Sequence, residues 1–256
     1  MVKAQDIVTY YKKKLTDDES IRYLAIHAKR YACLLNRLLK IRKAISEDPI
    51  ALMDIGPSYL TEYLEKIFPG DTVYSLGYSH PESRGGQLPE GVSINFENFI
   101  RFDLNDSQDR DKWITVPSCK LVVCAEVIEH LYTSPKLVLD FIRSFLDDAG
   151  VLVIQTPNAV TLYNRLTVLR GRNFIETIRE NNQNPGHFRE YTRDELFDLA
   201  KRCGFTVADF FYSNYFSDLE SPLKIKLYRM IQSILGDSFK DGMTAILNKQ
   251  NRTYHD

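Results

Sequence analysis

The amino-acid sequence predicts an α/β fold in which a mainly parallel β-sheet carries helices on both faces. From about residue 50 onward, short β-rich runs alternate with longer stretches that have apolar residues at helical spacing. One run, residues 120–125, is continuously apolar after its first lysine, as expected for a parallel strand buried on both faces. A chain of 256 residues with 44% hydrophobic and 26% charged residues is long enough to bury the core of one such domain.

The composition also excludes several classes of protein. A formal net charge of -1 offers no global attraction to nucleic acid or acidic membranes. The four cysteines form no C-x-x-C pair, which indicates reduced thiols. The N-terminus has no apolar signal-peptide core, and no run approaches the roughly 18 apolar residues of a spanning helix. We therefore expect a cytoplasmic protein without a membrane span.

The chain begins with a predicted helix over residues 1–47. Apolar residues such as Leu24, Ala28 and Tyr31 recur at helical spacing, and Asp48-Pro49 ends the pattern. Basic residues, Arg30 among them, fall on the other sides and predict a solvated face, and His27 is read as structural.

The most informative local pattern follows at residues 51–60. A strand ending in Asp54 leads into the turn Gly56-Pro57-Ser58, and helical spacing then continues to Ile67. A strand, a tight turn and a helix start place backbone N–H groups and the positive end of a helix around a ligand. Such units also occur without a ligand.

The remaining elements continue the alternation. Predicted strands cover residues 72–76, 94–104, 120–125, 151–155, 205–212 and 243–247, with helices near 105–113, 137–145, 192–204 and 222–235. Thr192 and Glu195 form a capping box. Residues 79–91 read as an irregular loop, and residues 156–191 as an insertion with a helix at 163–169. Insertions at the carboxyl edge of such a sheet usually close over a site.

Five segments in fixed order carry a family resemblance. They are M-D-I-G-P-S at 53–58, F-D-L-N at 102–105, V-V-C-A-E-V-I-E-H-L at 122–131, D-A-G-V-L-V-I-Q-T-P-N-A at 148–159, and H-F-R-E-Y-T-R-D-E-L at 187–196 followed by C-G-F at 203–205. Over most of residues 51–248 the chain resembles the class I S-adenosylmethionine-dependent methyltransferases, in the branch of the ubiquinone-pathway O-methyltransferases and small-molecule methyltransferases. The resemblance implies a Rossmann-like fold with a mainly parallel seven-stranded sheet.

The resemblance also implies a domain layout. We expect a single methyltransferase domain over residues 1–256, which begins with an N-terminal helical extension (1–49). The extension is followed by a cofactor-binding core (50–156) and a lid insertion (157–191). The last part is the C-terminal part of the sheet (192–256), which includes a helical insertion at 214–240.

The implied cofactor is S-adenosyl-L-methionine, with S-adenosyl-L-homocysteine as product, and no metal is expected. In the family the first loop surrounds the amino acid moiety, Asp103 accepts from the adenine amino group, Leu104 lies against the ring, and Glu126 lies near the sulfonium or amino acid end. The residues that map to the cofactor site are Asp54, Gly56, Pro57, Ser58, Gly77, Asp103, Leu104 and Glu126. Structural alternatives stay open, with Asp54 as a helix cap, Asp103 as a turn residue, and Glu126 and Glu129 as surface charges.

One position departs from the family pattern. Members usually carry an acid at the end of the second strand to hold the ribose hydroxyls. Residues 74–79 read Y-S-L-G-Y-S here, and the first carboxylate is Glu82. Ribose recognition would then need a hydroxyl, Glu82 or a main-chain group, for which Gly77 is the candidate.

Two histidines are candidate catalytic residues. Transfer from an activated donor needs mainly alignment, and a hydroxyl acceptor also needs a base. His130 is the first candidate because it follows the fourth strand, and its alternative role is to cap the helix near Ser134. His187 is the second, and its alternative is a structural position at the junction of lid and helix.

The predicted function is methyl transfer to a small-molecule acceptor, most simply at oxygen, with a sugar, glycolipid precursor or secondary metabolite as acceptor. Arginines in the 158–193 insertion would suit an acidic or phosphorylated acceptor, although ordinary solvation explains them too. The alternative is a non-catalytic cofactor-binding or partner-binding protein with the same fold. A nicotinamide-dependent reductase is disfavoured because the sequence lacks a G-x-G-x-x-G turn. Nucleic-acid methylation is disfavoured because no separate basic module is visible. A homodimer is left open.

Overall fold

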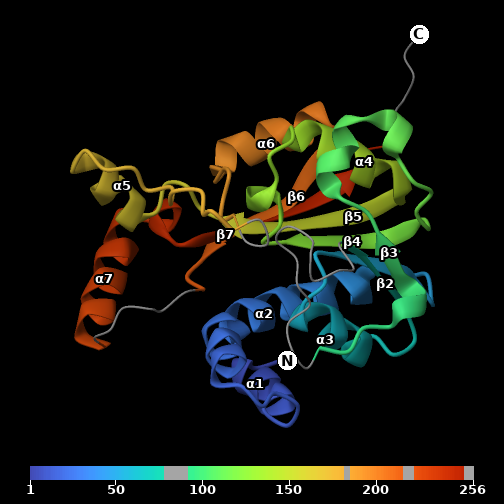
Figure 1. Cartoon of the computed structure of the whole chain (residues 1–256), viewed down its shortest axis with the longest axis horizontal. Helices are drawn as coiled ribbons and strands as arrows, with labels where there is room; N and C mark the ends of the chain where they lie inside the picture. The colour runs from blue at the N-terminus through green and yellow to red at the C-terminus, as the bar shows by residue number, and fades with distance from the viewer. Residues whose placement is uncertain (78–91, 182–184, 216–221, 251–256) are drawn as a thin grey trace.

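A computed structural model describes residues 1–77, 92–181, 185–215 and 222–250 (Figure 1). Its strands are β1 (Ala51–Ile55), β2 (Thr72–Gly77), β3 (Phe99–Arg101), β4 (Cys119–Ala125), β5 (Leu146–Pro157), β6 (Phe205–Ser213) and β7 (Gly242–Lys249). They form one seven-stranded sheet in the order β3-β2-β1-β4-β5-β7-β6. The pairs from β3 to β5 are parallel, and β7 runs antiparallel to both of its neighbours. This confirms the predicted mainly parallel seven-stranded sheet.

Helices cover both faces of the sheet, as predicted. They are α1 (Ala4–Tyr11), α2 (Asp18–Ala44), α3 (Tyr59–Ile67), α4 (Pro135–Phe145), α5 (Leu162–Leu169), α6 (Arg193–Arg202) and α7 (Pro222–Leu235). In Figure 1, α1, α2 and α3 lie below the sheet, α4 and α6 lie above it, and α5 and α7 project beyond one end. The backbone N–H of Tyr163 donates to the hydroxyl of Tyr228 at 3.1 Å, which ties α5 to α7. No helix within the described ranges has the length and apolar character needed to cross a membrane.

The two faces of the sheet bury separate apolar clusters. In β1, Leu52 packs toward α1, α2 and α3, while Met53 and Ile55 pack toward the cluster that contains α4 and α6. Successive side chains of a strand point to opposite faces, so a strand with helices on both sides must be apolar throughout. This is the physical reason for the continuous apolar run in β4.

Three predicted elements differ in extent. The predicted N-terminal helix is two helices, because the helical conformation is interrupted between Tyr11 and Asp18. The side chain of Asp17 accepts from the backbone N–H of Ser20 at 2.6 Å and caps α2. The third strand covers only residues 99–101, because a short 3-10 turn at Phe96–Asn98 precedes it. The fifth strand is longer than predicted and begins at Leu146.

Other local predictions are confirmed. Thr192 and Glu195 form the capping box of α6, and α7 has the predicted bounds. The predicted loop at residues 79–91, including Glu82, lies outside the described residues.

Candidate active site

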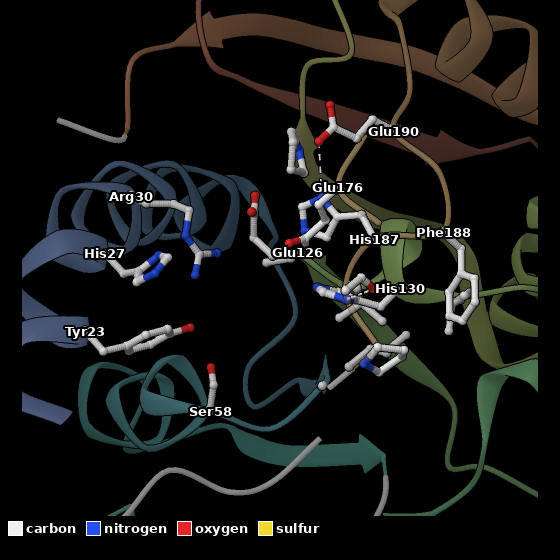
Figure 2. A pocket seen from close by; sticks show the side chains of 18 of the residues that line it. Tyr23, His27, Arg30, Ser58, Glu126, His130, Glu176, His187, Phe188 and Glu190 are labelled. Carbon is white, nitrogen blue, oxygen red and sulfur yellow. Dashed lines mark hydrogen bonds and ion pairs between the residues drawn. The ribbon is translucent and has the colours of Figure 1, made fainter. Parts of the chain in front are cut away.

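A cavity of about 1310 Å³ opens at the carboxyl ends of β1, β2 and β4 (Figure 2). This is the edge at which open α/β sheets usually bind ligands. The cavity also takes in one side of α2 and part of the insertion after β5. The site residues predicted from the sequence line it with the exception of Asp54, namely Gly56, Pro57, Ser58, Gly77, Asp103, Leu104, Glu126, His130 and His187.

The loop after β1 needs its glycine for two reasons. Gly56 has φ +81°, and a Cβ there would lie 2.7 Å from Cγ2 of Val127. Gly77 is similarly confined, because a Cβ on it would lie 2.8 Å from Cδ of Pro57. The ends of β1, β2 and β4 therefore pack directly against one another beneath the cavity.

Asp54 supports this loop from below. Its side chain is 1% exposed, and its Oδ2 accepts a hydrogen bond from the hydroxyl of Thr61 at 2.6 Å. The Thr61 oxygen in turn accepts from the backbone N–H of Ser58 at 2.8 Å, and Ser58 is the N-cap of α3. Burial raises the pKa of Asp54 to about 7. The carboxyl group thus fixes the start of α3 instead of facing the cavity.

Asp103 is both a turn residue and a cavity residue. Its Oδ1 accepts from the backbone N–H of Asn105 at 2.8 Å and from the Asn105 side-chain amide at 3.1 Å. The Asn105 oxygen accepts from the backbone N–H groups of Tyr132 and Thr133. This network joins the segment after β3 to the segment after β4. Leu104, which follows Asp103, is buried.

Glu126 follows β4 with an unusual backbone. Its φ is +57°, a left-handed conformation that non-glycine residues rarely adopt, and its N–H donates to the carbonyl of Gln155 at 2.7 Å. Oε1 of Glu126 is buried and has no hydrogen-bond partner among the described residues. Burial raises the pKa of Glu126, and the charge of Arg30 opposes that shift.

Arg30 corrects the prediction of a solvated basic face on α2. The side chain is 3% exposed, lines the cavity and points toward Glu126 (Figure 2). Its Nη1 donates to Oε1 of Gln155 at 3.3 Å, and its Nε has no hydrogen-bond partner in the described part of the chain. Tyr23 and His27 of α2 line the same cavity, with ring centroids 4.1 Å apart. The available signal in the sequence was the apolar Leu34 four positions after Arg30, since residues four apart lie on the same side of a helix and Leu34 is buried.

His130 and His187 come together from distant segments. Their ring centroids are 4.7 Å apart at an interplanar angle of 80°. Nδ1 of His130 lies 3.0 Å from the carbonyl oxygen of Gly186, and Nδ1 of His187 lies 3.2 Å from Oε1 of Glu190. Burial lowers the pKa of His130 to about 4, so the ring is neutral at pH 7.

Comparison with known proteins gives the family. The family described as "Methyltransferase domain" matches residues 23–209. A protein of Mycolicibacterium smegmatis, described as a probable S-adenosylmethionine-dependent methyltransferase, is 33% identical over 92 residues. That match covers 36% of this chain and 30% of the relative, so the chain corresponds to less than a third of the relative's length.

Solved structures show the same fold at low identity. An S-adenosylmethionine-dependent methyltransferase from Clostridium acetobutylicum superposes with a TM-score of 0.54 at 12% identity, covering 96% of this chain and 99% of that chain. Magnesium protoporphyrin IX methyltransferase from Synechocystis, solved with bound SAH, gives 0.52 at 12% identity and covers 96% and 94%. Because the family match extends over most of the 256 residues, the chain belongs to the methyltransferase domain family.

Proposed function

We propose that the protein transfers a methyl group from S-adenosylmethionine to an oxygen atom of a small-molecule acceptor. The observation that carries the proposal is a single cavity with the loop of residues 56–58 at one part and both His130 and His187 at another. A sugar, glycolipid precursor or other secondary metabolite is the acceptor class. The segment E-V-I-E-H-L at 126–131 supports the small-molecule branch that includes the ubiquinone-pathway O-methyltransferases.

The polar groups of the cavity suit the amino acid end of the cofactor. That end carries an ammonium and a carboxylate, and the cavity offers an unpartnered carboxylate oxygen on Glu126 and an unpartnered Nε on Arg30. Buried charged groups normally have partners, so a ligand that supplies both opposite charges would compensate them. Gly56, Pro57 and Ser58 would hold the same end through the backbone.

The adenosine end would lie against Asp103 and Leu104, with Gly77 beside the ribose. Strand β2 ends at Gly77 without an acid, so the ribose hydroxyls would rely on main-chain groups there. Hydrogen bonds to neutral groups are weaker than charge-assisted ones, which predicts a modest cofactor affinity.

The chain's own residues would act mainly on the acceptor. When bound, S-adenosylmethionine supplies a methyl group on a positively charged sulfur. The protein then has to align the acceptor oxygen and remove its proton. The contact between His130 Nδ1 and the Gly186 carbonyl assigns the N–H to Nδ1, which leaves the lone pair on Nε2 to take that proton.

The arginine of the insertion that lines the cavity, Arg179, is already paired with a glutamate, and this bears on the charge of the acceptor. Arg179 lines the cavity, but its Nη2 lies 2.7 Å from Oε2 of Glu176, which lines the cavity as well. An acidic or phosphorylated acceptor would therefore have to displace Glu176 from Arg179. A neutral hydroxylated acceptor needs no such exchange.

Calorimetry with S-adenosylmethionine tests the first half of the proposal. Saturable binding is expected, and the absence of binding at millimolar cofactor would exclude the enzyme. Glu126→Gln should weaken binding because it removes the charge that faces the ammonium.

Substitution of His130 tests the second half. His130→Ala should lower turnover of an accepted hydroxylated substrate by about 10²-fold or more, while the affinity for S-adenosylmethionine stays within error. Formation of S-adenosylhomocysteine measures turnover. Equal turnover by the variant and the wild type would remove His130 as the base.

A second candidate function is cofactor binding without turnover. The observation that favours it is the missing acid at the end of β2. Cofactor binding with no S-adenosylhomocysteine formed from a broad panel of hydroxylated compounds would support this candidate over the first.

A further inference from the structure

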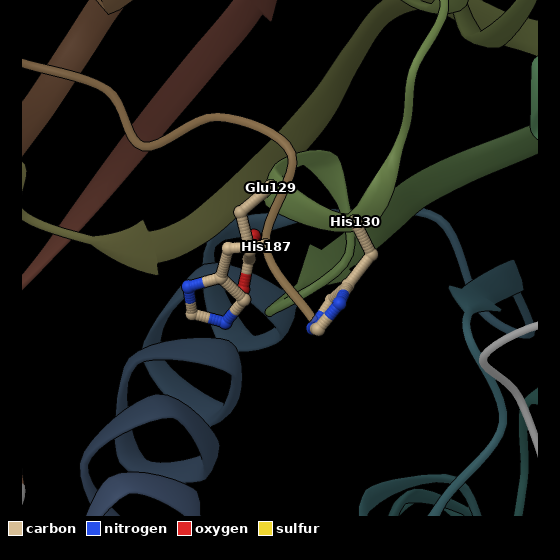
Figure 3. A group of neighbouring side chains, drawn as sticks. All are labelled: Glu129, His130 and His187. Atoms are coloured by element: carbon tan, nitrogen blue, oxygen red, sulfur yellow. The ribbon is translucent and has the colours of Figure 1, made fainter. Parts of the chain in front are cut away.

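Three side chains of metal-ligating types converge beside the cavity, and two of them, His130 and His187, line it. Glu129, His130 and His187 each offer one ligand atom, and these atoms all lie within 4.8 Å of one another (Figure 3). Glu129 and His130 lie in the 3-10 turn after β4, whereas His187 comes from the insertion after β5. The fold brings them together across 57 positions of sequence, from 130 to 187.

Both histidines are oriented as metal ligands usually are. A ligating histidine donates its second ring N–H to a carboxylate or a backbone carbonyl, which fixes the tautomer and the plane of the ring. Here Nδ1 of His187 faces Oε1 of Glu190, and Nδ1 of His130 faces the carbonyl of Gly186. In both rings this leaves the Nε2 lone pair available.

Glu129 supplies a second, independent sign of a missing ligand. The side chain is 0% exposed, and Oε2 accepts from the hydroxyl of Thr156 at 3.0 Å. Oε1 is buried and has no hydrogen-bond partner among the described residues. A buried carboxylate with one oxygen unpaired is costly, and a bound cation would compensate it.

We propose that Glu129, His130 and His187 bind a divalent transition-metal cation. Two imidazoles and one carboxylate suit zinc, manganese, iron or cobalt better than calcium or magnesium, which prefer oxygen ligands. Three protein ligands leave at least one coordination position open, and a molecule in the cavity that His130 and His187 line would be able to take it. The inference rests on the proposed function for the identity of the group that takes the open position, and with the metal bound it replaces the role of His130 as a base by the role of a ligand.

A cation here changes how the acceptor oxygen is activated. The lone pair of His130 Nε2 would bind the metal and could not also take a proton. A metal lowers the pKa of a coordinated hydroxyl, so the acceptor's proton would leave to solvent water and the oxygen would stay on the cation. The two histidines then serve as ligands, and the bound cation, instead of a general base, promotes the loss of the acceptor's proton.

Calorimetry of the chelator-treated full chain with manganese chloride, in the absence of S-adenosylmethionine, tests the proposal. The wild type should bind about one equivalent. Glu129→Gln keeps the acceptor for Thr156 and a similar volume, yet it should lower the affinity by at least about 10²-fold, and His187→Ala should do the same. Glu190→Ala should weaken binding by about 10-fold, because it releases the orientation of His187.

His27→Ala is the matched control. This histidine lines the same cavity but belongs to α2, and its removal should leave manganese binding unchanged. Thermal unfolding verifies that each variant is folded, and His187→Gln replaces any variant that is not. The proposal would be overturned if the wild type bound neither manganese nor zinc stoichiometrically. It would also be overturned if the folded Glu129 and His187 variants bound the metal as tightly as the wild type. Cofactor calorimetry on the same samples separates that result from a failure of the proposed function.

Discussion

Gly56 shows how one residue controls the geometry of the cavity. Its positive φ and its approach to Val127 leave no room for a side chain. The sequence already marked this turn as a ligand loop, but the packing partner on the segment after β4 could not be read from it.

Gly56→Ala should destabilise the fold and weaken cofactor binding. The left-handed conformation alone costs an alanine roughly 1–2 kcal/mol, and the contact with Val127 adds to that cost. Gly171→Ala is the control, since Gly171 has φ +71° and a Cβ there would meet no atom within 4 Å. Urea unfolding and cofactor calorimetry should show a larger loss of both quantities for Gly56→Ala than for Gly171→Ala.

Asp54 predicts a pH-dependent effect on stability. Burial raises its pKa from 3.8 to about 7 in the folded protein, so the folded state favours the neutral carboxyl. The stabilisation from this group is therefore full below pH 4 and is lost as the pH rises through 7.

Asp54→Asn stays neutral and should gain stability relative to the wild type as the pH rises. The gain should grow by about 1.4 kcal/mol per pH unit at most, between pH 4 and pH 7, and then level off. Urea unfolding of both proteins at pH 5 and pH 8 measures it. A difference that is the same at both pH values would contradict the raised pKa.

At the scale of elements, α2 contributes to the site as well as to the core. One side of the helix packs on the sheet, and residues such as Arg30 line the cavity. Amphipathic spacing predicted the helix, but an arginine is normally assigned to the solvent side. The hydrogen bond to Gln155 and the position of Glu126 across the cavity explain why this arginine is buried.

Arg30→Met should destabilise the protein because Glu126 loses its opposing charge. Arg30 donates to Gln155 at 3.3 Å, and its charge favours the ionised form of Glu126. Its removal therefore leaves a buried acceptor without its donor and a buried carboxyl group without a compensating charge, at a cost of about 1–3 kcal/mol. The double variant Arg30→Met/Glu126→Gln should recover much of that loss. Denaturant unfolding of the two single variants and the double variant gives the coupling, and strict additivity would show that the two groups do not interact.

At the scale of the whole molecule, the N-terminal helices are part of the folded unit. Ile7, Tyr11 and Leu38 are buried in the same cluster as Leu52 and Leu121 of the sheet. The sequence suggested an extension attached to a core that begins near residue 50. The structure shows that one face of the sheet depends on this extension for its cover.

Removal of residues 1–47 should therefore abolish cooperative unfolding, because the apolar face beneath α2 would meet water. Leu38→Ala in the full chain is a smaller change in the same cluster and should lower the free energy of unfolding by about 2–5 kcal/mol. Calorimetric melting distinguishes the outcomes. A truncated chain that melts cooperatively near the wild-type temperature would show that the extension is dispensable.

The sequence by itself determined the fold class, the order of most elements and the cavity-lining loops. These features depend on local periodicity, on glycine and capping residues, and on motif order, all of which are written along the chain. The tertiary structure alone decided that Asp54 lies beneath the loop, that Arg30 faces Glu126, and that Glu129, His130 and His187 meet. Such juxtapositions depend on how distant segments pack, and no local pattern encodes the distance between them.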